Sequence, residues 1–121
     1  MARFEIEGNE YELKLTYASA AHLDSLYEGG SLALVGKALT GSLDTFSHIV
    51  HAALFHTEQN FSKAKVDKAL EQAFEAEKLD LDSVLKISNE IVAKSFFYKK
   101  TVERLLSKDP KAKKAFEELL K

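Results

Sequence analysis

The chain has 121 residues, of which 45% are hydrophobic and 30% are charged, with no cysteine and a formal net charge of −2. This apolar content is enough to build a core in a chain of single-domain length, and it excludes an intrinsically disordered protein. The lack of cysteine excludes a disulfide framework and thiolate chemistry, and the net charge gives no overall attraction to nucleic acid.

Neither a membrane-spanning segment nor an export signal is predicted. No segment reaches the roughly 20 consecutive apolar residues that a membrane-spanning helix requires. Residues 1–12 alternate apolar and charged side chains and contain no apolar run of the signal-peptide type. We therefore expect one soluble domain over residues 1–121 that works in the cytoplasm without a membrane partner.

Residues 3–16 are predicted to form a β-hairpin. Apolar and polar side chains alternate on both sides of Gly8-Asn9, which is the typical pattern of two strands joined by a tight turn. A turn at these two residues implies apolar pairs on one face, Ile6–Tyr11 and Phe4–Leu13, and like-charged pairs on the other, Glu5–Glu12 and Arg3–Lys14. The apolar face must pack on other elements, because an isolated hairpin is only marginally stable.

The remainder, residues 17–121, is predicted to be helical, because apolar residues recur there every three or four positions. Capping residues and a proline mark six helix starts: Thr16 or Ser19, Ser31, Ser42 or Asp44, Ser62, Asp82, and Asp109-Pro110. Glycines end the first helix at about residue 28 and the second at Gly41, and the fifth and longest helix runs to about Ser107.

The apolar stripes of these helices predict how they pack. The third helix, with Phe46, Ile49, Val50, Ala53 and Leu54, is the predicted central one. The stripe residues of the others are Val66, Leu70, Ala73 and Phe74 in the fourth, Val84, Ile87, Ile91, Ser95, Tyr98, Val102 and Leu105 in the fifth, and Ala112, Phe116, Leu119 and Leu120 in the last. The predicted fold class is mainly α (α+β), with an N-terminal β-hairpin packed on a compact bundle of about five or six helices.

Few residues are candidates for chemistry. The segment from Gly30 to Lys37 superficially resembles a phosphate-binding loop, but the spacing is one residue too long and Ala38 replaces the hydroxyl that magnesium needs. His48 and His51 could reach one metal ion from a single helix face, with Asp44 one turn before them. Histidines on a polar face or at an interface are the favoured interpretation, because no other ligand lies at helical spacing. No catalytic, cofactor-binding or metal-binding residue is predicted, and we do not expect an enzyme.

Phe96, Phe97 and Tyr98 form a consecutive aromatic triplet. Consecutive helical residues point about 100° apart, so the three rings cannot all face one core. Either the helix is packed on two sides, or at least one ring faces a partner. Aromatic side chains beside cations are typical of interfaces, and Lys94, Lys99 and Lys100 flank the triplet. The candidate partner-binding residues are Phe96, Phe97, Tyr98, Lys99 and Lys100.

Charge is unevenly distributed along the chain. Residues 1–30 hold two basic and six acidic side chains, a net −4, and residues 94–121 hold nine basic and four acidic, a net +5. Opposite charges at the two ends can meet within one molecule or between neighbouring copies. Between copies the contact is head-to-tail, which builds rings or open arrays, and we expect this self-association. The candidate residues are Glu5, Glu7, Glu10 and Glu12 at one end and Lys111, Lys113 and Lys114 at the other.

Four segments together resemble the tail assembly chaperones of long-tailed bacteriophages, in particular those of phages and prophages of Gram-positive hosts. They are residues 3–8 (RFEIEG), 25–30 (SLYEGG), 48–56 (HIVHAALFH) and 95–100 (SFFYKK). The resemblance implies a non-catalytic protein that binds the tape measure protein and keeps it soluble during tail morphogenesis. It also implies an oligomer in the host cytoplasm that is absent from the mature virion. A longer, frameshifted form would recruit the major tail tube protein.

Other functions remain open. One is a different small cytosolic protein-binding or regulatory module, and another is a small metal-dependent enzyme that uses His48 and His51. A nucleic-acid binder is disfavoured, because Glu103, Glu117 and Glu118 interrupt the basic C-terminal region.

Overall fold

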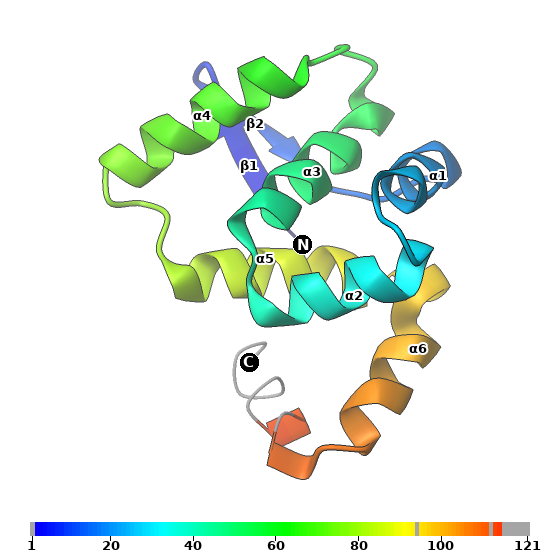
Figure 1. Ribbon diagram of the computed structural model, residues 1–121. Helices are drawn as coiled ribbons and strands as arrows, with labels where there is room; N and C mark the ends of the chain where they lie inside the picture. Colours follow the sequence, from blue (N-terminus) through cyan, green and yellow to red (C-terminus); the bar gives the residue numbers. More distant parts are fainter. Residues whose placement is uncertain (1, 94, 112, 115–121) are drawn as a thin grey trace.

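The computed structural model describes residues 2–93, 95–111 and 113–114, and within them a two-stranded hairpin precedes six α-helices (Figure 1). This arrangement confirms the predicted fold class. The elements are β1 (Arg3–Ile6), β2 (Asn9–Glu12), α1 (Tyr17–Leu26), α2 (Gly30–Thr40), α3 (Leu43–Ala53), a 3-10 turn η1 (Phe55–Thr57), α4 (Lys63–Glu75), α5 (Leu81–Ala93) and α6 (Phe96–Ser107). That the whole chain forms one domain stays a prediction.

The hairpin register differs from the predicted one. The pairs are Arg3–Glu12, Phe4–Tyr11, Glu5–Glu10 and Ile6–Asn9, so the turn residues are Glu7 and Gly8. Their φ angles are 51° and 84°, as a tight hairpin turn with two left-handed residues requires. The predicted turn at Gly8-Asn9 was wrong. The shift keeps the same residues on each face, but it places Arg3 opposite an acid instead of a lysine.

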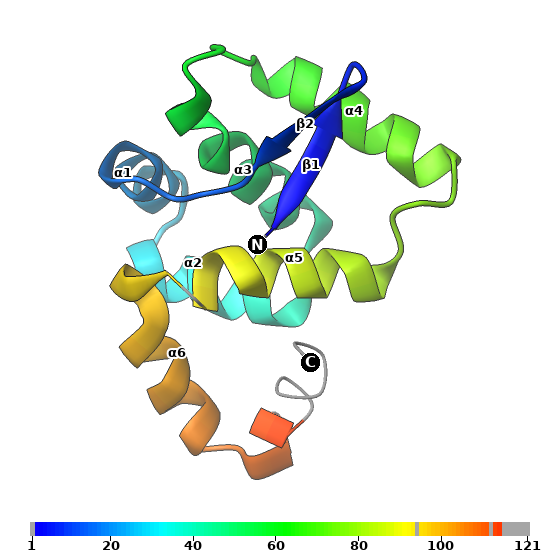
Figure 2. The same ribbon diagram turned by 180° about the vertical axis from the view of Figure 1, so that it is seen from behind.

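Helix α3 is the central helix, as predicted. It contacts α1, α2, α4 and α5, and Figure 1 shows it in the middle of the molecule. Its first turn is capped by Ser42, whose hydroxyl accepts the Thr45 N–H at 3.2 Å. Two cross-links attach earlier elements to its end: Ser19 Oγ of α1 donates to the Ala52 carbonyl at 2.7 Å, and the backbone N–H of Lys14 donates to the Ala53 carbonyl at 3.1 Å. The hairpin lies across α3 and α4 in the view from behind (Figure 2).

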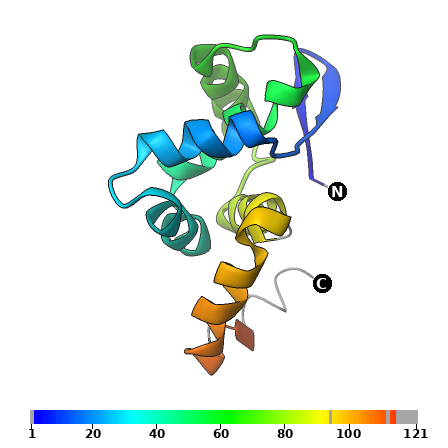
Figure 3. The ribbon, with the colours of Figure 1, turned by 90° about the vertical axis from the view of Figure 1, so that its right-hand side faces the viewer.

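The fifth predicted helix is two helices in the structure, which corrects its predicted length. Ser95, with φ −70° and ψ 129°, leaves the helical conformation between α5 and α6. Figure 3 shows α6 turning away from α5 at this point. A single helix was predicted because the helical spacing of apolar residues continues across the break. Ser95 itself favours the break, because serine is common at the position just before a helix. After the break α6 buries Leu106 and leaves Leu105 37% exposed, so the predicted stripe ends one residue too early.

Several helix ends also differ from the prediction. Helix α1 ends at Leu26 rather than near residue 28, and α2 begins already at Gly30. Ser31 is therefore inside α2 and donates to Asp24 Oδ1 at 2.9 Å instead of capping the helix. The cap of α5 is Asp80 rather than Asp82: Asp80 Oδ1 accepts the Ser83 N–H at 2.8 Å, and Ser83 Oγ accepts the Asp80 N–H at 2.9 Å.

The predicted stripe of α4 is only partly buried. Val66 and Leu70 are in the core, whereas Phe74 is 60% exposed, which contradicts its predicted place. After α6, residues 110–111 and 113–114 are helical, in agreement with a helix start at Pro110. The apolar side predicted for that helix falls outside the described residues (Ala112, Phe116, Leu119 and Leu120), as do Lys94, Glu117 and Glu118.

Candidate functional site

The histidines lie in separate packing environments. His51 Nε2 donates to the Phe61 carbonyl at 3.0 Å, whereas His48 Nε2 is 3.9 Å from Asp44 Oδ1. Burial lowers the pKa of both rings, and Lys63 lowers the pKa of His48 further. Among the residues that the structure describes, no cluster of three or more His, Cys, Asp or Glu side chains is suited to holding a metal ion. The ring of His51 makes one hydrogen bond and packs edge to face on Phe55, and the ring of His48 packs edge to face on Tyr27.

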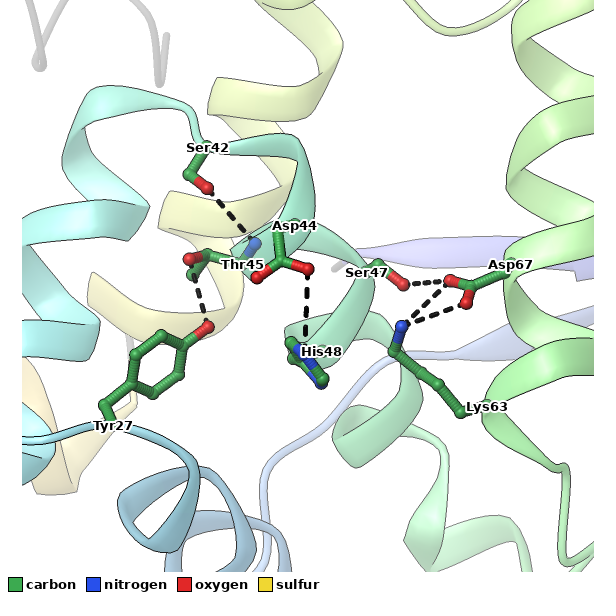
Figure 4. Close-up of polar contacts among 8 residues, drawn as sticks. All are labelled: Tyr27, Ser42, Asp44, Thr45, Ser47, His48, Lys63 and Asp67. Atoms are coloured by element: carbon green, nitrogen blue, oxygen red, sulfur yellow. Dashed lines mark hydrogen bonds and ion pairs between the residues drawn. The ribbon is translucent and has the colours of Figure 1, made fainter.

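A polar bridge joins α3 to α4 beside His48 (Figure 4). Ser47 donates to Asp67, and Lys63 Nζ lies 3.0 Å from both carboxylate oxygens of the same side chain. Burial opposes ionisation of Asp67, but the hydrogen bonds from Ser47 and Lys63 outweigh it and hold its pKa below the usual value. Every member of this cluster has a partner within the chain, so its role is to fix α4 against the central helix.

An apolar groove of about 370 Å³ lies between the first turn of α1 and the start of α6. This volume is within the range of about 300–1,000 Å³ that is usual for binding pockets. Two aromatic side chains stand at its edges almost fully in solvent, since Tyr17 and Phe96 are each 91% exposed. Its apolar lining residues are Leu15, Tyr17, Ala20, Ala21, Phe96 and Phe97.

The structure divides the aromatic triplet. Phe96 and Phe97 line the groove, and Phe97 is 57% exposed. Tyr98 is 2% exposed and lies in the core, where its ring makes an edge-to-face contact with Phe97 at 4.9 Å between centroids. Lys99 and Lys100 are exposed on the next turn of α6. The candidate partner-binding residues therefore stay together at one end of α6, apart from Tyr98, which does not reach the surface.

Sequence reasoning missed Tyr17 as a groove residue. It follows the cap Thr16, whose Oγ1 accepts the Ser19 N–H at 3.2 Å, and so it is the first residue of α1. Its helical neighbours three and four positions on are Ala20 and Ala21, which are too small to cover the ring. This spacing is a usable signal, but the opposite wall of the groove depends on the bend at Ser95, which the sequence pattern did not predict.

The acidic residues of the hairpin are divided between internal and external roles. Glu7 pairs with Lys65 of α4 at 3.2 Å, and Glu10 pairs with Arg3 at 3.0 Å. Glu5 and Glu12 make no ion pair with the described part of the chain. At the other end, the described side chains of Lys111, Lys113 and Lys114 are exposed.

Comparison with protein families places this architecture. A family model described as phage tail assembly chaperone protein, TAC, matches residues 3–107. The chain belongs to this family. The matched part of the tail assembly chaperone contains the hairpin, α1 to α6 and every residue of the groove, whereas Lys111, Lys113 and Lys114 lie beyond it. Searches of curated proteins and of solved structures gave no match. None of the described helices of the chaperone combines the length and the apolar character needed to cross a membrane.

Proposed function

We propose that this tail assembly chaperone binds the tape measure protein and keeps it soluble while the phage tail is assembled. The observation that carries the proposal is the number of large apolar side chains that the fold leaves in solvent. They are Tyr17, Leu26, Leu32, Leu43, Phe74, Leu81, Phe96, Phe97 and Leu105. A holding chaperone needs apolar surface to cover apolar segments of its client. Tyr17, Phe96 and Phe97 gather such surface at one groove, and exposed apolar patches mark interaction sites.

The proposal includes the setting of the activity. The chaperone acts in the host cytoplasm, as an oligomer and without a cofactor, and it is absent from the mature virion. A longer form made by frameshifting recruits the major tail tube protein. Family membership supports a non-catalytic role in tail assembly. The separate partners of His48 and His51 weigh against the metal-enzyme alternative.

Co-expression tests the client. The tape measure protein of the same phage is produced alone and together with the chaperone, and its soluble fraction and its co-purification are measured. We expect a largely insoluble protein alone and a soluble complex in the presence of the chaperone. An unrelated small helical protein, expressed at the same level, is the control. A tape measure protein that gains no solubility and does not co-purify contradicts the proposed function.

A further inference from the structure

We propose that the groove between α1 and α6 is the client-docking site, and that it receives an amphipathic helix whose acidic side chains face Lys99 and Lys100. This inference rests on the proposed function, because the helix is taken to belong to the client. It adds where the helix binds, which side chains anchor it and which charge it carries beside its apolar face.

Both walls of the groove are held by the core. The first turn of α1, which carries Tyr17, is anchored by Ser19, which is fully buried and donates to the Ala52 carbonyl of α3. The first turn of α6, which carries Phe96 and Phe97, is anchored by the buried Tyr98, whose ring contacts Phe97 edge to face. Exposed aromatic rings on rigid helix starts lose little conformational freedom on binding, and this preorganisation favours affinity. Such rings are the common anchors of protein interfaces.

The floor of the groove is suited to a helix. Ala20 and Ala21 are small, so the apolar side chains of a bound helix can enter between the rings. A helix that docks in an apolar groove places its residues i, i+3, i+4 and i+7 there. Asp24 and Ser31, which are hydrogen-bonded at 2.9 Å, form a polar end to the groove. The apolar contact is thus bounded on that side.

The positive charge of Lys99 and Lys100 beside the groove favours a bound helix that carries acidic side chains next to its apolar face. Lys99 and Lys100 follow Phe96 by three and four residues, so they lie on the same side of α6. Both are exposed, and neither forms an ion pair with any described carboxylate. Two unpaired cations beside an aromatic edge favour acidic side chains at the same position on the partner and disfavour basic ones.

Two synthetic helical peptides test this charge preference. They share one leucine face and carry either glutamate or lysine beside it, and their binding to the full chain is measured by calorimetry at low salt. We expect the glutamate peptide to bind at least about tenfold more tightly. The variant K99E/K100E should reverse the order. The variant K68E/K86E, which makes the same charge change at exposed sites outside the groove, should keep the order of the unmodified chain.

Two truncation variants test the anchors. We expect F96A/F97A to weaken binding of the glutamate peptide by more than about tenfold. F74A removes an exposed ring of α4 outside the groove, and it should change the affinity for this peptide by less than about twofold. Because Phe96, Phe97 and Phe74 are all largely exposed, thermal unfolding should be nearly unchanged in each variant. Equal binding by F96A/F97A and the unmodified chain would overturn the groove assignment.

The full-length client separates this inference from the proposed function. If F96A/F97A still keeps the tape measure protein soluble, the groove assignment fails and the proposed function stands. If the unmodified chain binds the glutamate peptide through these residues but does not bind the tape measure protein, the docking site stands and the proposed client is wrong. A groove occupied by a second copy would show no peptide binding, and F96A/F97A would then reduce oligomer size in sedimentation. That result would overturn the proposal.

Discussion

Gly41 lies directly against Leu85: a Cβ atom placed on Gly41 would come within 2.8 Å of Leu85 Cδ2. Gly41 is also the C-cap of α2, with φ 79°, a left-handed conformation that favours glycine. Gly41 thus ends α2, and its lack of a side chain lets α5 pack closely against the end of α2.

A glycine substitution inside α2 and one at its C-cap should have opposite effects. Gly41→Ala combines an unfavourable φ with the contact to Leu85, so we expect it to destabilise the fold by about 1–3 kcal/mol. Gly36→Ala lies inside α2, where the added Cβ meets nothing within 4 Å, and it should stabilise by about 0.5–1 kcal/mol. Urea unfolding of both variants measures the difference. Equal effects of the two would show that neither the φ angle nor the contact at Gly41 matters.

The hydroxyl of Tyr98 should be dispensable for folding, and its ring should not be. The buried oxygen has no hydrogen-bond partner of good geometry in the described part of the chain, and the nearby Ser31 hydroxyl donates its own proton to Asp24. Burial also raises the pKa of this hydroxyl. We expect Tyr98→Phe to be neutral or stabilising by about 1 kcal/mol, and Tyr98→Ala to destabilise by about 3–5 kcal/mol.

The same pair of variants separates the core from the groove. Tyr98→Phe should leave binding of the glutamate peptide unchanged, because the hydroxyl is buried. Unfolding in urea and calorimetry on the same preparations provide both readouts. A Tyr98→Phe variant that is clearly less stable would indicate a partner for the hydroxyl.

Stability should fall between neutral and mildly acidic pH because of His48 and His51. Burial holds the pKa of both rings below their ordinary 6.5 in the folded state. The unfolded chain then binds protons more readily, so this contribution to stability is present above pH 6.5 and is lost as pH falls through 6.5 toward the folded pKa values. His51 Nε2 donates to the Phe61 carbonyl, so protonation of this ring would occur at Nδ1. Because Nδ1 is buried without a partner in the described structure, the protonated form is disfavoured in the folded state.

The free energy of unfolding of the chain and of H48Q/H51Q, measured from pH 5.5 to 8, checks this prediction. The double variant should fold and should depend less on pH. An unchanged pH dependence would assign it to other groups. Loss of a stoichiometric metal together with collapse of the fold would support the metal-site alternative instead.

Local signals predicted much of the fold. Ser62 caps its helix as predicted, and Thr16 and Ser42 are the caps that the structure selects from two candidates each; all three accept the N–H three residues on. Gly41 ends α2 for the conformational reason that the sequence suggested. These features depend on a few neighbouring residues, and so they are readable without knowledge of the tertiary structure.

The hairpin turn and the bend at Ser95 were predicted wrongly, because the apolar pattern of the sequence fits either alternative equally well. Both hairpin turns keep the same faces, and the observed one is identified by the positive φ angles of Glu7 and Gly8 and by the pairing of Arg3 with Glu12. The helical spacing of apolar residues continues on both sides of Ser95, so the sequence pattern did not predict the bend there. The spacing predicted that at least one ring of the triplet would be exposed, and it did not tell which: Phe96 and Phe97 are exposed and Tyr98 is buried. The groove itself needs Tyr17 as well, and that ring comes beside them only because α6 turns.

Self-association should depend on the hairpin acids that the fold leaves unpaired. Glu5 and Glu12 make no ion pair with described residues, whereas Glu7 and Glu10 are held by Lys65 and Arg3. We therefore propose that Glu5 and Glu12 contribute most to head-to-tail contact with the lysines at 111, 113 and 114 of a neighbouring copy. Charge is screened beyond about 10 Å at ordinary salt, so apolar contacts must supply most of the affinity.

Light scattering over a salt series, at several protein concentrations, measures this association. We expect oligomers at low salt that shrink as salt is added and in the variant E5Q/E12Q. The matched variant E7Q/E10Q loses the same charge but breaks only ion pairs within one chain, so it should reduce the size of the oligomers less. The triple variant K111Q/K113Q/K114Q should behave like E5Q/E12Q, because it removes the other half of the contact. A chain that stays monomeric at high concentration and low salt would leave the charge asymmetry as a feature of the single molecule, and equal effects of both glutamate pairs would remove the distinction between paired and unpaired acids.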